Sequence, residues 1–133
     1  MKAEYTYNED GEATYTASME DSDTWNADIL MSHLITSVMR EYRGQHHQLT
    51  SVFPTHIDDV PEHLREDWKS CQVEDTPLDT SWSFCPSVCD YILDEIIHAF
   101  DPEYDYPVGA DAGTTRQDKG RMLFAKYFHS FWT

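Results

Sequence analysis

The clearest pattern of apolar and polar positions lies in residues 86–107, PSVCDYILDEIIHAFDPEYDYP. When residues 87–100 are wound as a helix, apolar side chains occupy one half of its surface and polar side chains the other, because residues four apart share a face. This pattern is typical of a helix that packs one face on a core. The apolar half consists of Val88, Cys89, Ile92, Leu93, Ile96, Ile97, Ala99 and Phe100, and the polar half of Asp90, Tyr91, Asp94, Glu95, His98 and Asp101.

The sequence also indicates where this helix begins and ends. Ser87 and Asp90 have the spacing of a capping box, which favours a helix start at the serine. Asp101 precedes Pro102, and a proline disfavours helical geometry in the residue before it. We therefore expect the helix to run from Ser87 to about Phe100, followed by a loop in which acids alternate with tyrosines.

A second amphipathic helix is predicted from Thr24 to Arg43, and we interpret it as a central core helix. Residues 22–24 offer caps at its start, and Arg43 suits the negative end of the helix dipole. Gly44 is suited to the C′ position that follows a helix. The apolar positions with helical spacing are Trp25, Ile29, Leu30, Leu34, Ile35, Val38, Met39 and Tyr42.

A shorter helix is predicted after Asp59, which we expect to cap it. Pro61 then falls in the first turn and Glu62 at the capping-box position. Three apolar residues spaced four apart form its expected core face. These residues are Val60, Leu64 and Trp68.

The last predicted helix runs from Thr115 to Trp132, with Thr115 and Asp118 as a capping pair. Gly120 weakens this helix by about 1 kcal/mol relative to alanine, which favours fraying of the first turn. A dense aromatic stripe follows the glycine. It consists of Phe124, Tyr127, Phe128, Phe131 and Trp132, with Leu123 beside them.

The first residues of the chain have the alternation of a β-hairpin. Residues 3–7 and 13–17 place Tyr and Ala on one face and Thr on the other, and the loop Asn8–Gly11 supplies turn residues. A two-stranded ribbon is marginally stable alone, so we expect a third strand or a covering helix. Leu49–Phe53 and Thr80–Phe84 are the candidate strands. The predicted fold is a single α+β domain, in which this hairpin belongs to a small antiparallel sheet packed against three to four helices.

Composition adds a strong charge to this picture. The chain has 133 residues and a formal net charge of −16, from 25 acids and 9 bases, while 14% of its residues are aromatic. A chain this rich in aromatic residues has the material for a core, so disorder is a poor explanation of the charge. The charge disfavours nucleic acid and anionic membrane as direct partners and favours basic proteins. With no signal peptide and no membrane-spanning run, and with three cysteines, we expect a reduced, cytoplasmic setting.

The bases are unevenly distributed along the chain. None occurs between Lys69 and Arg116, and only Lys2 precedes Arg40. Ten acids lie in the first of these intervals, so the folded chain is expected to have an acidic side. They are Glu74, Asp75, Asp79, Asp90, Asp94, Glu95, Asp101, Glu103, Asp105 and Asp111.

Several side chains could carry chemistry instead. The spacing of Cys85 and Cys89 is possible for zinc, although no compact second pair supports it, and a cysteine on the apolar face of a helix behaves as a small hydrophobe. A small metal-binding or hydrolytic enzyme remains an alternative, but we assign no catalytic residue, metal ligand or cofactor. The residues that would have to converge for it are His46, His47, His63, Cys71, Cys85 and Cys89.

An ordered domain with this charge could imitate the phosphate field of a nucleic acid. The acids of residues 87–101 place four charges along about 16 Å of helix, whereas duplex DNA carries one charge per about 1.7 Å. Acids from neighbouring segments, either residues 74–79 or residues 20–28, would therefore have to converge with them. The residues expected to contact a partner are Asp90, Asp94, Glu95, Asp101, Glu103, Tyr104, Asp105 and Tyr106.

In overall character the chain is similar to the small acidic inhibitors that phages and mobile elements make against restriction or CRISPR systems, some of which mimic DNA. The resemblance is one of class and carries over no residue. It implies a non-enzymatic inhibitor that blocks the basic, nucleic-acid-binding groove of a partner protein or complex. The other alternative is an assembly adaptor with an apolar contact surface, whose acids only confer solubility.

Overall fold

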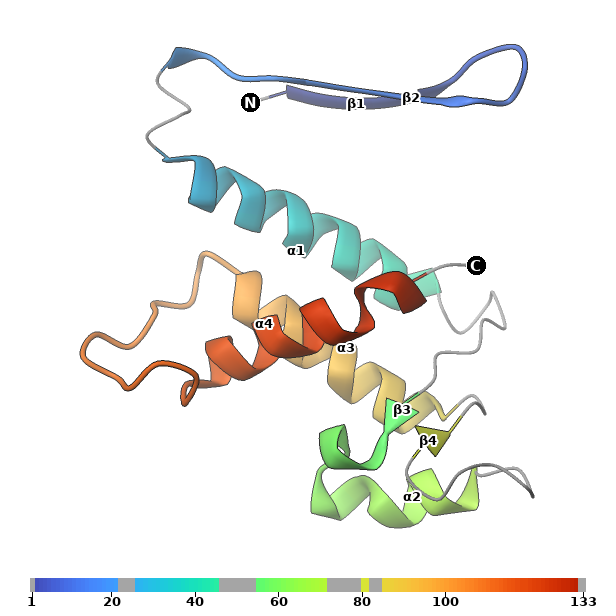
Figure 1. Cartoon of the computed structure of the whole chain (residues 1–133), viewed down its shortest axis with the longest axis vertical. Helices are drawn as coiled ribbons and strands as arrows, with labels where there is room; N and C mark the ends of the chain where they lie inside the picture. The colour runs from blue at the N-terminus through green and yellow to red at the C-terminus, as the bar shows by residue number, and fades with distance from the viewer. Residues whose placement is uncertain (1, 22–25, 46–54, 72–79, 82–84, 132–133) are drawn as a thin grey trace.

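Helix α3 (Pro86–Phe100) lies at the centre of the structure, and α1 (Ala27–Gln45) and α4 (Arg116–Tyr127) pack against it (Figure 1). The computed structural model describes residues 2–21, 26–45, 55–71, 80–81 and 85–131. An N-terminal β-hairpin lies above α1, on the side away from α3 (Figure 1). The predicted α+β class, with a hairpin at the N-terminus, is confirmed.

Helix α3 forms the core as its sequence predicts, with one change at its start. Five of its side chains are fully buried and Ala99 is nearly so. The helix begins at Pro86 with Cys85 as N-cap, so the capping box predicted at Ser87 was wrong; proline is favoured in the first turn, where its missing N–H is not needed. The five fully buried residues are Val88, Cys89, Ile92, Leu93 and Ile96.

Helix α1 is not the central helix that its periodicity predicted. Only Thr36 and Met39 are buried, whereas Leu34 and Val38 are 37% and 56% exposed. The reason is that α1 packs one narrow stripe on α3 and leaves its other apolar positions uncovered. Gly44, predicted as the C′ residue, lies inside the helix, and the predicted caps at residues 22–24 lie outside the described residues.

Helix α4 approaches α3 closely because of Gly120. A Cβ atom at this position would overlap the backbone carbonyl oxygen of Glu95 and lie 2.5 Å from the Cβ of Ala99. The predicted capping box of Thr115 and Asp118 is present, so the first turn is capped. The predicted last helix is divided into α4 and a short 3-10 helix, η4 (Phe128–Ser130).

The hairpin consists of two strands only, within the described part of the chain. Strand β1 (Lys2–Tyr7) pairs antiparallel with β2 (Ala13–Ser18), and Gly11 in the connecting loop has a φ of 81°, as a tight hairpin loop requires. Thr80–Ser81 forms β4, which pairs with β3 (Thr55–His56) and not with the hairpin. The other candidate strand, Leu49–Phe53, lies outside the described residues.

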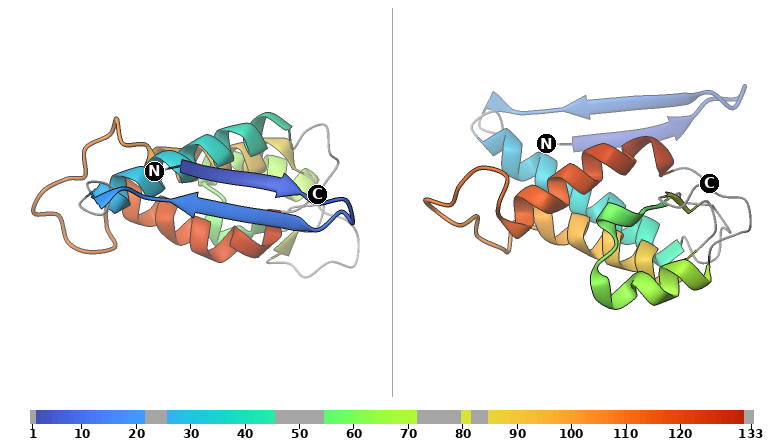
Figure 2. Two further views of the ribbon diagram at one scale, coloured as in Figure 1. Left: turned by 90° about the horizontal axis from the view of Figure 1, so that it is seen from above. Right: turned by 60° about the horizontal axis from the view of Figure 1, so that its bottom comes forward.

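The segment from β3 to residue 71 folds against the start of α3 (Figure 2). Asp59 lies within a 3-10 turn, so its predicted role as the helix cap was wrong. The predicted core face is confirmed for Val60 and Trp68, which are both 2% exposed, and the Trp68 indole donates a hydrogen bond to Thr55 Oγ1 at 2.8 Å. The elements are η2 (Ile57–Asp59), η3 (Glu62–Leu64) and α2 (Arg65–Ser70).

Candidate interaction surface

The acids of α3 are joined to arginines of other helices. Arg43 of α1 donates from Nε to Asp94 Oδ1 at 2.5 Å and from Nη2 to Asp94 Oδ2 at 3.2 Å, and Asp90 lies 4.0 Å from the same guanidinium. The hydrogen bond to Asp94 raises the pKa of Arg43. Arg43 therefore neutralises part of the charge that the sequence assigned to a partner-binding face.

Glu95 of α3 is also bound by an arginine, in this case from α4. Arg116, at the start of α4, donates two hydrogen bonds of 2.9 Å to the two carboxylate oxygens of Glu95. The hydrogen bond to Glu95 raises the pKa of Arg116. This paired arrangement is the strong form of a charged contact, and it links α3 to α4.

Asp101 has a structural position at the end of α3. Its side chain is 6% exposed, accepts a 2.5 Å hydrogen bond from Arg40, and accepts a 3.0 Å bond from the backbone N–H of Glu103. A buried carboxylate needs such partners, because an unpaired charge away from water is costly. Asp101 thus stabilises the turn after α3, and its side chain presents little surface.

The other four predicted contact residues lie together on the loop between α3 and α4. Glu103, Tyr104, Asp105 and Tyr106 are all exposed, and the two tyrosine side chains are 53% and 41% exposed. Neither acid forms an ion pair with a described residue. This loop is therefore an exposed part of the predicted contact surface, whereas the exposed Asp94 is paired with Arg43.

Asp118 holds the loop to the start of α4. It accepts hydrogen bonds from the Tyr106 hydroxyl at 2.9 Å and from the backbone N–H groups of Gly113 and Thr115. Desolvation opposes ionisation of this carboxyl group, but the hydrogen bonds from Tyr106, Thr115 and Gly113 outweigh it and lower the pKa of Asp118. Arg121 lies over the Tyr106 ring, 5.6 Å from its centre.

Acids from three segments lie along one side of the molecule. The residues after β2, the start of α1 and the α3–α4 loop are on the left in all three views, and the hairpin lies above the loop in Figure 1 (Figures 1 and 2). Residues 19–21, 26–39 and 102–115 contain no Lys or Arg. We call the exposed acids of these segments the acidic end, and they are Glu20, Asp21, Asp28, Glu103, Asp105 and Asp111. Residues 74–79, the other expected source of acids, lie outside the described residues.

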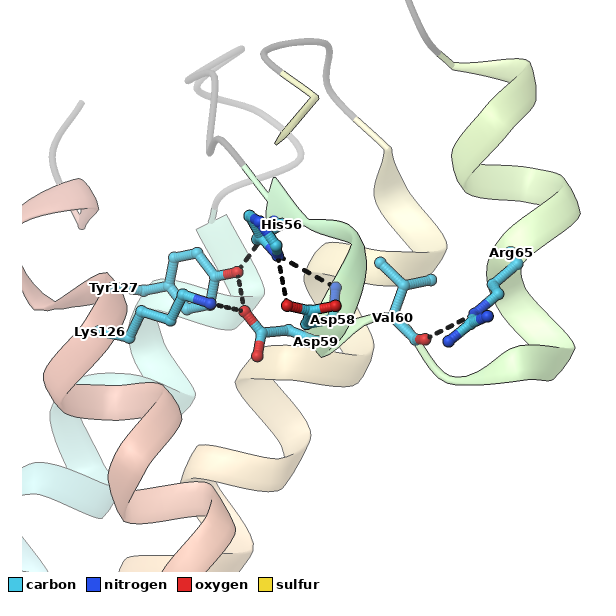
Figure 3. Close-up of polar contacts among 7 residues, drawn as sticks. All are labelled: His56, Asp58, Asp59, Val60, Arg65, Lys126 and Tyr127. Carbon is cyan, nitrogen blue, oxygen red and sulfur yellow. Dashed lines mark hydrogen bonds and ion pairs between the residues drawn. The ribbon is translucent and has the colours of Figure 1, made fainter. Parts of the chain in front are cut away.

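A polar network that the sequence did not reveal joins β3 and η2 to α4 (Figure 3). Asp59 Oδ2 accepts hydrogen bonds from Tyr127 Oη at 2.5 Å and Lys126 Nζ at 2.6 Å, and Tyr127 Oη accepts from the His56 N–H at 3.0 Å. Burial, together with the bond to Asp59, raises the pKa of Tyr127. Since its carboxylate is occupied by two donors, Asp59 is held as a structural acceptor and not as a free base.

A cleft of ≈ 400 Å³ lies beside this network. Two lysines and two aspartates line it together with apolar side chains, so their charges balance and favour neither an anion nor a cation. The lining residues are Asp58, Asp59, Tyr91, Lys119, Met122, Leu123 and Lys126.

The cysteines belong to the core. Cys85 and Cys89 are buried and Cys71 is half-buried, and burial raises the pKa of the Cys89 thiol to about 12. A thiol with so high a pKa is a poor nucleophile. Among the described residues no group of three or more His, Cys, Asp or Glu side chains could hold a metal ion. His46 and His47 lie outside the described residues.

An apolar groove of ≈ 360 Å³ runs between α1 and the C-terminal helices. Its walls include side chains that remain exposed, among them Leu34 and Val38 on α1 and the 55% exposed Phe128 on η4. The groove follows from the incomplete burial of α1. Its lining consists of Leu34, Ile35, Val38, Met39, Tyr42, Phe124, Phe128 and Phe131.

No protein-family model, curated protein or solved structure matches this chain. Among the described helices, none combines the length and the apolar character needed to cross a bilayer.

Proposed function

We propose that this protein is a non-enzymatic acidic binding protein that blocks the basic, nucleic-acid-binding groove of a partner protein. The observation that supports the proposal best is the acidic end, where exposed acids from three segments lie in stretches without any Lys or Arg. A basic groove built to bind phosphates would attract such a surface, and long-range attraction would speed the encounter.

Within this surface the exposed loop after α3 is the proposed centre of contact. Glu103 and Asp105 supply charges outside any described ion pair, while Tyr104 and Tyr106 supply exposed aromatic area. Tyrosines with a fixed position are frequent anchors of binding energy. Both rings have neighbours that orient them, since Tyr104 lies 4.1 Å from the His98 ring and Tyr106 is bonded to Asp118. The ion-paired acids of α3 link it to α1 and α4 and contribute less to the external field.

The test is a pull-down from the native host with mass spectrometry, using wild type and two variants that each lose three charges. One variant combines Glu103→Gln, Asp105→Asn and Asp111→Asn; the control combines Glu62→Gln, Glu66→Gln and Asp67→Asn, which are exposed on η3 and α2. We expect wild type and the control to retain a nucleic-acid-binding protein that the loop variant loses. Its affinity for wild type should fall at least tenfold between about 0.05 M and 0.3 M salt. Recovery of no nucleic-acid-binding protein would contradict the proposal.

A second candidate function is an assembly adaptor that binds through the apolar groove. The supporting observation is the exposure of Leu34, Val38 and Phe128 around a groove of ≈ 360 Å³. Binding there should be insensitive to salt and should be lost in Val38→Glu. The matched control is Met122→Glu, which changes an exposed apolar residue of α4 on the other cleft.

A further inference from the structure

Strand β2 is an edge strand without any charged residue. The strand sequence ATYTAS contains no charged residue, proline or glycine, in a chain with a formal net charge of −16. Strand β1 carries Lys2 and Glu4, which form a 2.8 Å ion pair. Exposed edge strands are usually protected by charges, prolines or bulges, because their open backbone groups pair with other strands. Strand β1 has such protection, and β2 does not.

The register determines which backbone groups of β2 point outward. The N–H of Asn8 donates to the carbonyl of Glu12 at 2.9 Å, so this pair at the loop is a hydrogen-bonded pair. Hydrogen-bonded and non-hydrogen-bonded pairs alternate in an antiparallel ladder. Thr14 and Thr16 are therefore bonded to β1, opposite Thr6 and Glu4. The outward N–H and C=O groups belong to Ala13, Tyr15 and Ala17.

This edge is open in the described structure. Six consecutive pairs join β1 to β2 without a bulge, and no third strand pairs with either of them within the residues that are described. The side chains of Ala13, Thr14, Thr16 and Ala17 are exposed. A strand of another molecule could therefore continue the sheet along β2.

The charges at the two ends of β2 indicate what kind of strand fits. Glu12 precedes the strand, and Glu20 and Asp21 follow it, while no Lys or Arg occurs between Ala3 and Met39. A second copy of this chain would bring the same acids to both ends of the pairing. An extended segment with an uncharged centre and Lys or Arg at both ends would complement them.

We propose that β2 is a docking edge that binds an extended, basic-flanked strand of the partner by antiparallel strand addition. The inference rests on the proposed function, since it assigns the basic partner a second point of attachment. Main-chain hydrogen bonds at Ala13, Tyr15 and Ala17 hold the added strand, and the acids beyond β2 select its flanking cations. The two attachment points are β2 and the α3–α4 loop. They are separate segments of the chain, so substitutions can alter one without the other.

The probe is an octapeptide with alternating threonine and valine between two terminal arginines, and the control peptide has glutamates at both ends. Hydrogen exchange of the full-length protein is followed by NMR. We expect the arginine peptide to slow exchange of the Ala13, Tyr15 and Ala17 amides at least tenfold, with little change at Thr14 and Thr16. The glutamate peptide should bind at least tenfold more weakly.

Two proline variants form a matched pair. Ala3 and Ala17 lie opposite each other in one non-hydrogen-bonded pair, so each proline removes one outward N–H and no bond between β1 and β2. Ala17→Pro should weaken binding of the arginine peptide at least tenfold, whereas Ala3→Pro should leave it nearly unchanged.

Several results would overturn the inference. They are absent binding of the arginine peptide, unchanged exchange at the three β2 amides in its presence, or protection of β1 amides in place of β2. Protection of the β2 amides in the free monomer would show that another segment of the chain already occupies the edge, and a dimer formed through β2 would assign it to a second copy.

Binding of the host partner to the variants distinguishes a failure of this inference from a failure of the proposed function. If the partner binds Ala17→Pro like wild type but not the loop variant, the docking edge is wrong and the acidic end stands. If the arginine peptide protects β2 but no nucleic-acid-binding protein is captured, the edge is real and the proposed function fails.

Discussion

Helix α3 and the N-terminal hairpin both place apolar side chains at regular spacing, yet only α3 is buried. Helices α1 and α4 pack against α3, and five of its side chains are fully inaccessible. In the hairpin, every side chain whose exposure is described is exposed, including the 67% exposed Tyr7. Spacing therefore predicts the type of an element, whereas burial depends on how many other elements cover its apolar face.

The two regions also use charge differently. Asp94 and Glu95 on α3, and the buried Asp101 at its C-terminal end, bind arginines of α1 and α4, so their charges link helices. The acids beyond β2 and on the α3–α4 loop lie in segments without bases. We infer that the helical layer supplies stability and that the hairpin and the acidic end supply contact surface.

The largest effect is expected for Leu93→Ala. Leu93 is fully buried in α3, so the substitution removes apolar contact and leaves a cavity. We expect a loss of about 2–5 kcal/mol in the free energy of unfolding, measured by urea denaturation. The matched control is Leu34→Ala on α1, where the leucine is 37% exposed and the loss should stay below about 1 kcal/mol. Equal losses at both positions would contradict the contrast between the two helices.

A smaller loss is expected for Gly120→Ala. The added methyl group would overlap the Glu95 carbonyl oxygen and Ala99, so α3 and α4 would have to separate. We expect a net loss of about 1–3 kcal/mol despite the better helix propensity of alanine. Gly44→Ala in α1 is the control, because no described atom lies within 4 Å of a Cβ built there, and it should stabilise by up to about 1 kcal/mol. Urea denaturation measures the free energy of unfolding of both variants. Destabilisation by Gly44→Ala would contradict the explanation that close packing at Gly120 causes the loss.

Next in size is Asp101→Ala. The substitution leaves the N–H of Glu103 without its acceptor and removes the partner of Arg40 at a buried position. We expect a loss of about 1–3 kcal/mol. Asp94→Ala, which breaks an ion pair whose carboxylate is 52% exposed, should cost less than about 1 kcal/mol. Thermal and urea unfolding of both variants measure these losses. If Asp101 served only in partner binding, Asp101→Ala would leave the free energy of unfolding unchanged, and the structural role would be wrong.

The sequence predicted those features that depend on neighbours in the chain. The spacing of Ile92 and Ile96 indicated the buried face of α3, and Thr115 with Asp118 indicated the start of α4. It could not show that α3 is more deeply buried than α1, because both helices have apolar residues at helical spacing. The difference in burial arises from the tertiary contacts that cover α3. Nor could the sequence show that Asp94 and Asp101 are paired, since their arginines are 51 and 61 positions away in the chain. The loop around Tyr104 was assigned to the surface because acids alternate with tyrosines there, and that local signal does not depend on packing.

The smallest effect on global stability is expected for Thr16→Gly in β2. Glycine weakens a strand interior, and we expect the hairpin to open more often by about 1 kcal/mol. Because the described hairpin side chains are exposed and do not belong to the core, the global free energy of unfolding should change by less than about 0.5 kcal/mol. Hydrogen exchange measures both quantities at once. The Thr14 amide should exchange about fivefold faster, while the amide of Ile92 in α3 should be unchanged. Parallel acceleration at Ile92 would mean that hairpin and helices unfold as one unit, and the separation of a stable helical layer from an independent contact surface would then be wrong.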